Sequence, residues 1–156
     1  MTSDDDPHVV DLEVEVAGTP EQVWQAIATG AGISAWLQPT TVQEWEGGRF
    51  AFDMAALGMG MNDSGRVTAW QPPHRFATGG VRWQPPGAPA AVLATEWLVE
   101  VVSGGRCRVR MVMSGFGSGA AWDQEVQALT EGMRKALEQL RSYLASRPSR
   151  AADRSA

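Results

Sequence analysis

The strongest constraint on the fold is a helical repeat of apolar residues near the end of the chain. Apolar side chains recur at spacings of three and four between residues 122 and 144, and they are Trp122, Val126, Leu129, Met133, Leu137, Leu140 and Leu144. This period predicts one amphipathic helix over 121–145. Such a helix would be about 35 Å long, which is long enough to cross a whole sheet.

The chain before this helix shows the alternation of a sheet. Apolar and polar residues alternate at period two, and this predicts strands over 8–16, 49–54, 59–70, 75–83, 91–102 and 106–114. A hairpin turn or a bulge is expected at 62–65, and a tight turn at 103–105. After the first strand, Thr19, Pro20 and Gln22 have the pattern of a capped helix start. A second short helix is expected over 33–37, ended by Pro39.

This order of elements predicts the fold class. Links of hairpin length between successive strands indicate an antiparallel sheet, and helices gathered on one face of such a sheet make an α+β fold. We therefore expect a curved antiparallel sheet wrapped around the long C-terminal helix. A chain of 156 residues has room for one domain. We place that domain at 8–146, with flexible tails at 1–7 and 147–156.

Composition and charge exclude several classes of function. A single cysteine allows neither an internal disulfide nor a four-cysteine metal site, and no HxxxH, CxxC or HxxE spacing occurs, so we expect no metal or cofactor. The net charge of -5 argues against a nucleic-acid or anionic-membrane partner. No apolar run approaches the length of a membrane span. The acidic start, residues 1–6, is unlike a signal peptide, so a cytoplasmic location is expected.

Three features invite a functional interpretation, and a purely structural role is preferred for each of them. Residues 115–120 read G-x-G-x-x-A between a strand and a helix, but no following strand exists to complete a dinucleotide site, so we interpret them as a flexible joint. His74 falls in a turn and His8 near the end of the chain, which argues against a Ser-His-Asp triad. Cys107 falls on the inner face of a strand and is expected to be a buried apolar residue rather than a nucleophile.

The carboxylates leave more room for chemistry. Asp53 could face either way, and Glu96 points outward if Trp97 points inward, although a register change of one residue would reverse this. An inward Glu96 would be the best candidate for a general acid or base. Asp123 and Glu125 lie in the first turns of the long helix, where acidic residues favour the helix dipole.

A family resemblance appears in the first half of the chain. Residues 19–27 (TPEQVWQAI) and 33–37 (ISAWL) resemble an opening segment of the START-like, or SRPBCC, superfamily, in the branch of heat-shock-protein-90 ATPase activator homologues. Residues 65–67 (GRV), 75–76 (RF), 114–116 (SGF) and Gly132 extend the resemblance over about residues 9–145, although Met133 stands where that branch usually has Trp. The resemblance implies a helix-grip fold with a cavity between the sheet and the C-terminal helix. In relatives, that cavity holds lipids, polyketides, aromatic hormones or no known ligand.

The residues expected on the inner faces are unusually rich in Trp and Met. As a group they suit an adaptable apolar cavity, because Met repacks around varied ligands and Trp combines a broad ring with one N–H donor. The candidate ligand-binding residues are Trp36, Phe52, Met54, Trp97, Met111, Met113, Trp122, Val126, Leu129 and Met133.

Three hypotheses of function follow. The first is binding of a hydrophobic or aromatic small molecule in the cavity. The second is a cyclase or hydrolase that uses a cavity carboxylate such as Asp53 or Glu96. The third is regulation of a chaperone ATPase, which the resemblance suggests, although we expect this chain to lack the additional N-terminal domain of the eukaryotic activators. Pairing into a homodimer through a sheet edge stays open.

Overall fold

A computed structural model describes residues 9–37, 39–53 and 62–146, and it contains three helices and seven strands. Met54 and the two tails lie outside these residues. The elements in chain order are β1 (Val10–Ala17), α2 (Pro20–Ala28), α3 (Gly30–Trp36), β2 (Thr40–Val42), β3 (Arg49–Asp53), β4 (Asn62–Gln71), β5 (Arg75–Trp83), β6 (Ala91–Ser103), β7 (Arg106–Ser114) and α4 (Ala120–Ala145).

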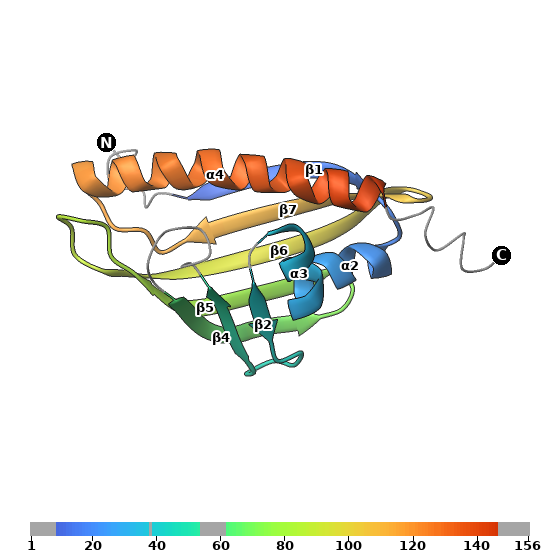
Figure 1. Cartoon of the computed structure of the whole chain (residues 1–156), viewed down its shortest axis with the longest axis horizontal. Coiled ribbons are helices and arrows are strands. Elements are labelled where there is room, and N and C mark those ends of the chain that lie inside the picture. Colours follow the sequence, from blue (N-terminus) through green and yellow to red (C-terminus); the bar gives the residue numbers. More distant parts are fainter. Residues whose placement is uncertain (1–8, 38, 54–61, 147–156) are drawn as a thin grey trace.

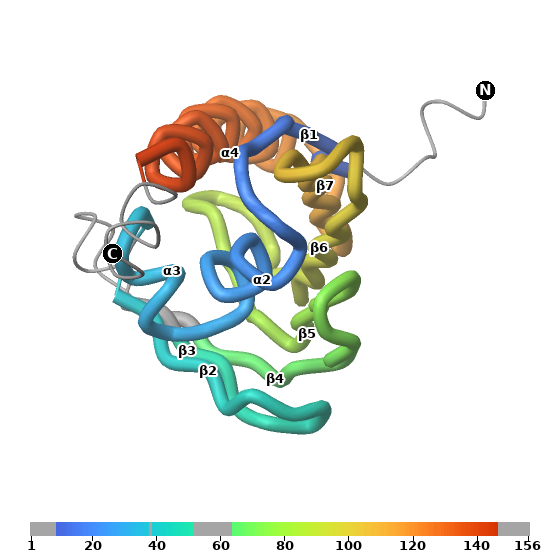
Figure 2. The backbone as a smooth tube through the Cα atoms, turned by 90° about the vertical axis from the view of Figure 1, so that its right-hand side faces the viewer, coloured from blue at the N-terminus to red at the C-terminus, as the bar shows by residue number. Residues whose placement is uncertain are grey.

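All the strands form one antiparallel sheet. Their order is β1-β7-β6-β5-β4-β3-β2, so the first strand is inserted beside the last one and every other neighbour follows in sequence. The sheet curls into a half-barrel, α4 lies along its concave side, and α2 and α3 sit across one end (Figures 1 and 2). The predicted α+β class, the curved sheet around a long C-terminal helix and the two short helices after the first strand are confirmed.

The first short helix begins as its sequence predicts. The Thr19 hydroxyl accepts a hydrogen bond from the Gln22 backbone N–H at 3.2 Å, and the Gln22 side chain accepts one from the Thr19 N–H at 2.9 Å. These two bonds satisfy free donors of the first helical turn. The inner face of α2 places Trp24 edge-on against Trp70 and Phe76, with ring centres 5.0 and 6.1 Å away. This aromatic contact fastens α2 to the end of the half-barrel.

The long helix is packed unevenly along its length. In its C-terminal half, Leu137, Leu140 and Leu144 are buried, whereas Leu129 and Met133 in the N-terminal half are only partly buried. Apart from the buried Trp122 near its start, the N-terminal half is therefore packed more loosely on the sheet than the C-terminal half. The connection from β7 uses Gly115 and Gly119, both at positive φ, as the predicted glycine-rich joint requires.

Two local expectations are wrong. Residues 62–65, expected as a hairpin turn or a bulge, belong to β4, where Ser64 pairs with Ala51 and Gly65 with Phe50. The ladder with β3 outweighs the turn preference of Asn, Asp, Ser and Gly. Val101 continues the alternation of Leu93, Trp97 and Val99, which predicts an inner face for it as well, but the residue is 53% exposed.

Ion pairs cover the outer face of the sheet. Glu100 of β6 pairs with Arg108 of β7, whose guanidinium donates to it at 3.0 Å. Arg110 instead forms two bonds to Asp11 of β1, at 2.8 and 2.6 Å. The Arg110 guanidinium lowers the pKa of Asp11 through these bonds. None of the helices in the described part of the chain has the length and apolar character needed to cross a membrane.

Candidate ligand-binding cavity

A cavity of about 320 Å³ lies between the concave face of the sheet and the loosely packed half of α4. This volume is at the lower end of the range for small-molecule sites. Three sets of residues line it: Ile33, Trp36, Leu37, Thr40 and Phe50 from the α3 to β3 segment; Phe76, Thr78, Val81, Trp83, Leu93, Thr95, Trp97, Met111 and Met113 from the central strands; and Glu125, Ala128, Leu129, Gly132, Met133 and Ala136 from α4.

The structure brings six of the ten candidate ligand-binding residues together in this lining. They are Trp36, Trp97, Met111, Met113, Leu129 and Met133. Trp122 and Val126 lie elsewhere. Trp122 packs on Phe116 and donates its indole N–H to the Pro89 carbonyl at 3.0 Å, and Val126 packs against the core. The side chain of Phe52 and the whole of Met54 lie outside the described residues.

Trp36 has two roles in the wall of the cavity. Its indole N–H donates to the Ala26 carbonyl at 2.8 Å, which ties α3 to α2. Its ring stands edge-on to Trp97, with ring centres 6.3 Å apart. The position of this wall is therefore set by both a hydrogen bond and an aromatic contact.

A β-bulge in β5 brings an unexpected residue into the lining. Thr78 pairs with Thr95 and Val81 pairs with Leu93, so β5 advances by three residues over a stretch in which β6 advances by two. Gly80, at φ +76°, absorbs the extra residue. The inward face consequently shifts from even to odd positions, and Trp83 faces the cavity. The Gly79-Gly80 pair was the signal in the sequence that could have revealed this.

Trp83 meets the one charged side chain of the described lining. Its indole N–H donates to Glu125 Oε2 at 2.7 Å, which joins the end of β5 to the start of α4. The sequence interpretation assigned Glu125 to the helix dipole alone. The bond to Trp83 depends on tertiary contact between positions 42 residues apart, and no local pattern in the sequence predicts it.

Two threonines add polar groups to the floor of the cavity. Thr78 and Thr95 are directly opposite each other on β5 and β6. Thr78 is 4% exposed, and neither hydroxyl forms a hydrogen bond within the part of the chain that the structure describes. Buried hydroxyls are normally paired, so the hydroxyl of the buried Thr78 stands out in an otherwise apolar floor.

Three of the other catalytic candidates, Glu96, His74 and Cys107, do not line the cavity. Glu96 lies on the outer face, as it does when Trp97 points inward, and pairs there with Arg75 at 2.5 Å. The Asp53 side chain is outside the described residues. His74 is exposed in the turn after β4, with Nδ1 3.2 Å from the Val99 carbonyl oxygen. Cys107 is fully buried, and burial raises the pKa of its thiol.

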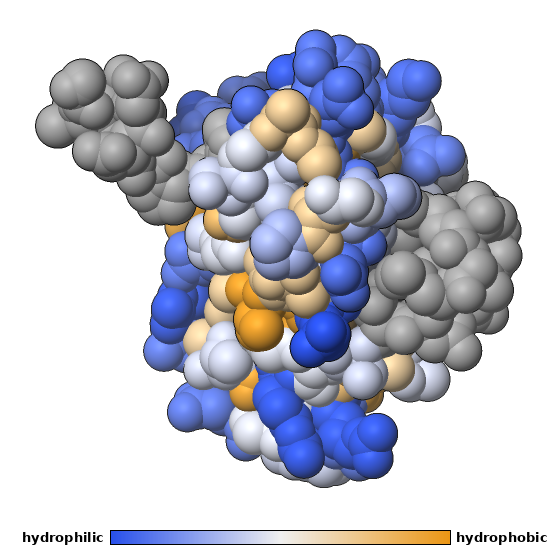
Figure 3. Space-filling model, turned by 90° about the vertical axis from the view of Figure 1, so that its left-hand side faces the viewer, coloured by the Kyte–Doolittle hydropathy of each residue, from blue (hydrophilic) through white to orange (hydrophobic). Residues whose placement is uncertain are grey.

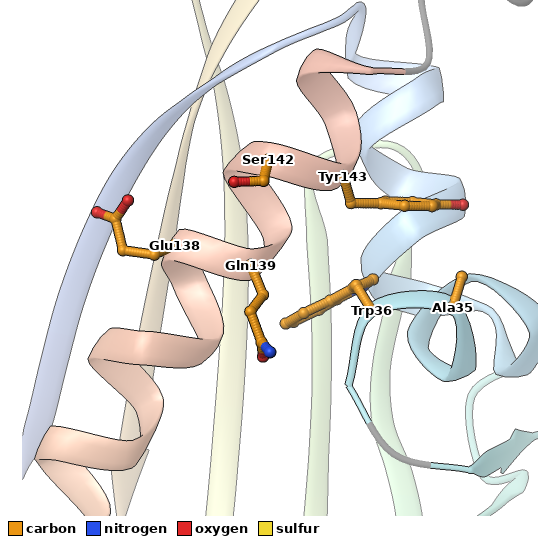
Figure 4. A pocket seen from close by; sticks show the side chains of 6 residues that line it. All are labelled: Ala35, Trp36, Glu138, Gln139, Ser142 and Tyr143. Carbon is orange, nitrogen blue, oxygen red and sulfur yellow. The ribbon is translucent and has the colours of Figure 1, made fainter.

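A second depression is shallower and lies outside the core. It runs between α3 and the C-terminal half of α4, and it is lined by Ala35, Trp36, Glu138, Gln139, Ser142 and Tyr143 (Figure 4). Most of these side chains are polar, and the groove is open to solvent. At the end of the molecule that holds the β5–β6 loop and the start of α4, apolar residues reach the surface among polar ones (Figure 3). No three His, Cys, Asp or Glu residues of the described ranges are placed to hold a metal ion.

Comparisons with known proteins agree with this architecture. A protein from Mesorhizobium loti, MLL2253, has the same fold with a TM-score of 0.76 at 20% identity, over 90% of this chain and 98% of its own. The Aha1 dimer from Colwellia psychrerythraea gives a TM-score of 0.67 at 16% identity, over 88% and 96%. The di-domain ARO/CYC BexL, from the BE-7585A biosynthetic pathway, gives 0.71 at 19%, over 86% of this chain and 45% of its own.

At these identities the structural likeness shows the fold alone. A search of curated protein sequences gave no match. A family model does match, over residues 17–145, which is most of the chain and includes every element that lines the cavity. The chain therefore belongs to the family described as activator of Hsp90 ATPase homolog 1-like proteins.

Proposed function

We propose that this protein binds a small hydrophobic molecule with an aromatic part in the cavity between the sheet and α4. The observation that carries the proposal is the cavity itself, which is lined mainly by aromatic, aliphatic and methionine side chains with few polar groups. Small-molecule sites are usually built in this way. The SRPBCC resemblance and the family membership support the proposal, since an open space under the helix is what that fold provides.

The packing of α4 also supports it. Leu129 and Met133 are only partly buried, although they are in the apolar stripe of the helix. A ligand in the cavity would cover these side chains and remove their apolar surface from water, at about 25 cal/mol per Å². Met111 and Met113, on the facing strand, have flexible side chains that can adapt to ligands of different shape.

The experiment is a thermal-shift screen of lipophilic aromatic compounds, followed by calorimetric titration of those that stabilise the protein. A ligand at 100 times its Kd should stabilise the folded state by about 2.7 kcal/mol. Leu129→Trp should fill the cavity and abolish binding, while Gln127→Trp, on the exposed side of the same helix, should leave binding unchanged. A folded protein that binds no member of a broad library would refute the proposal.

An enzymatic role is the second candidate, because one carboxylate, Glu125, does line the cavity. The sequence analysis had named Asp53 and Glu96 as the candidate carboxylates for this role, and Glu125 is the carboxylate found in the described lining. General acid–base chemistry needs a group within hydrogen-bond reach of the reacting atoms. Mass spectrometry of a bound ligand after long incubation tests this candidate, and a ligand recovered unchanged would argue for binding alone.

Three further proposals rest on fewer observations. Regulation of a chaperone ATPase is suggested by the family description, and an ATPase assay with and without the protein tests it. A cytoplasmic location is the second of these proposals, and fractionation of cells that express the protein tests it. A homodimer is supported by the dimeric form of the Colwellia protein, and sedimentation over a range of concentrations tests it.

A further inference from the structure

We infer that the natural ligand of the cavity is a lipophilic amine, with a protonated nitrogen held at Glu125 and an aromatic body held by the rings of the wall. This inference rests on the proposed function, because it specifies the chemistry of the molecule that the cavity takes. It is carried by the charge, the free hydrogen-bonding capacity and the aromatic content of the lining, and each of these is considered in turn.

The charge of the lining has one sign. Glu125 is the one ionisable side chain among the described lining residues, and no Lys, Arg or His of the described chain forms an ion pair with it. A carboxylate beside an apolar cavity attracts a cation and repels an anion, and it does so more strongly than in water because the surroundings are less polar. A fatty acid or an acyl phosphate would meet repulsion here, whereas an ammonium group would be paired.

Glu125 has acceptor capacity to spare. Trp83 Nε1 bonds to its Oε2 at 2.7 Å. A carboxylate has about four acceptor positions, and Oε1 has no partner among the described residues. The Trp83 bond holds the carboxylate group in place, so a ligand nitrogen would meet a positioned acceptor and not a freely rotating one.

The aromatic content of the wall is also suited to a cation. Five aromatic side chains line the cavity, and they are Trp36, Phe50, Phe76, Trp83 and Trp97. Aromatic faces attract ammonium groups through their quadrupole, most strongly in the case of Trp and when water is excluded. A cavity that combines one carboxylate, bonded to Trp83, with four further aromatic rings therefore has a composition that recognises amines, and the same rings would stack on an aromatic body.

The hydroxyls of Thr78 and Thr95 supply a second polar position on the floor. They lie opposite each other on neighbouring strands, and they can each donate and accept a hydrogen bond. They would bond to a neutral polar group of the ligand, such as a carbonyl or ether oxygen. We therefore expect the amine and this neutral group to be at different places on the aromatic body.

The test uses three probes that share one aromatic body: naphthylethylamine, ethylnaphthalene and naphthylacetate. Binding is measured by calorimetry and by the NMR signal of the Trp83 indole N–H, assigned through Trp83→Phe. The amine should bind at least 10-fold more tightly than the hydrocarbon, and the acid more weakly than both. Binding of the amine should shift the NMR signal of the Trp83 indole N–H, because this N–H donates its hydrogen bond to Glu125.

Glu125→Gln is the decisive variant, because it keeps the size of the side chain and an oxygen that can accept from Trp83 but removes the charge. It should reduce the affinity for the amine about 10-fold, or about 1.4 kcal/mol, leave the hydrocarbon unchanged and improve binding of the acid. Glu131→Gln, at an exposed position on the same helix, should change none of these affinities.

The outcomes separate the two proposals. If the amine and the hydrocarbon bind equally, and Glu125→Gln changes neither, the cavity is a binding site but the assignment of an amine is wrong. If the acid binds most tightly, the assignment is also wrong. If none of the three probes binds the folded wild-type protein while larger lipophilic compounds do, the amine assignment is wrong but the proposed function stands. If no compound binds, both proposals are wrong.

Discussion

Replacing Thr78 by Val should make the free protein more stable. Thr78 is 4% exposed, and its hydroxyl has no hydrogen-bond partner in the described part of the chain. Burying an unpaired hydroxyl costs about 1–3 kcal/mol in proteins. Val has nearly the same shape, is also branched at Cβ and is favoured in strands, so the substitution removes this cost without opening a cavity. We expect a gain of about 1 kcal/mol in the free energy of unfolding.

The assay is urea unfolding followed by Trp fluorescence, with the midpoint shifted upward and the slope unchanged. In thermal unfolding the same gain raises Tm by about 2–4 °C for a chain of this size. Thr68→Val is the matched control, because Thr68 is exposed on the neighbouring strand β4 and its hydroxyl stays in water. It should change stability by less than about 0.5 kcal/mol.

A loss of stability in the Thr78→Val variant would refute the reasoning. It would mean that the hydroxyl is paired in the free protein, and an ordered water in the cavity is the partner that the surroundings allow. A gain in stability together with weaker ligand binding would show that the unpaired hydroxyl is retained for the ligand, at some expense in stability.

Three further predictions concern backbone, thiol and charge. Gly80→Ala should destabilise the protein by about 1–2 kcal/mol, because φ is +76° at this position. Gly132→Ala, inside α4 with nothing within 4 Å of the added carbon, should instead stabilise the protein by about 0.5–1 kcal/mol. Denaturant titration of both variants tests these opposite signs. Cys107 should not react with Ellman's reagent until the protein unfolds, because its thiol is buried and burial raises its pKa; fast reaction of the native protein would contradict this placement. The pKa of Asp11 is lowered by Arg110, so its contribution is present above its unfolded pKa of about 3.9 and is lost as the pH falls through the lower folded value. Asp11→Asn should therefore reduce stability at pH 7 by less than about 1 kcal/mol, since the pair is exposed, and this loss should shrink as the pH is lowered through the folded value. A loss of stability that does not change with pH would rule out the ion pair as its cause.

The candidate site shows how far residue patterns alone can reach. Trp97, Met111 and Met113 were placed on the inner face because their strands keep a strict alternation, and the structure finds all three in the lining. Trp122 obeys the helical period equally well, but the period states only which side of α4 it is on. It does not state that this turn of the helix meets the β5–β6 loop, at the Pro89 carbonyl, instead of the cavity.

The amino-acid sequence by itself determined the α+β class, the order of the elements apart from the short strand β2 and the buried face of α4 and of most strands, because these follow from local periods of two and 3.6 residues. The tertiary structure decided which buried residues meet. The bulge at Gly79-Gly80 turns Trp83 inward, and contact across the cavity gives it Glu125 as a partner. Pairing with β3 also made 62–65 a strand instead of a turn. These outcomes depend on strand register and on contacts between distant segments, and neither is encoded in the local period of side chains.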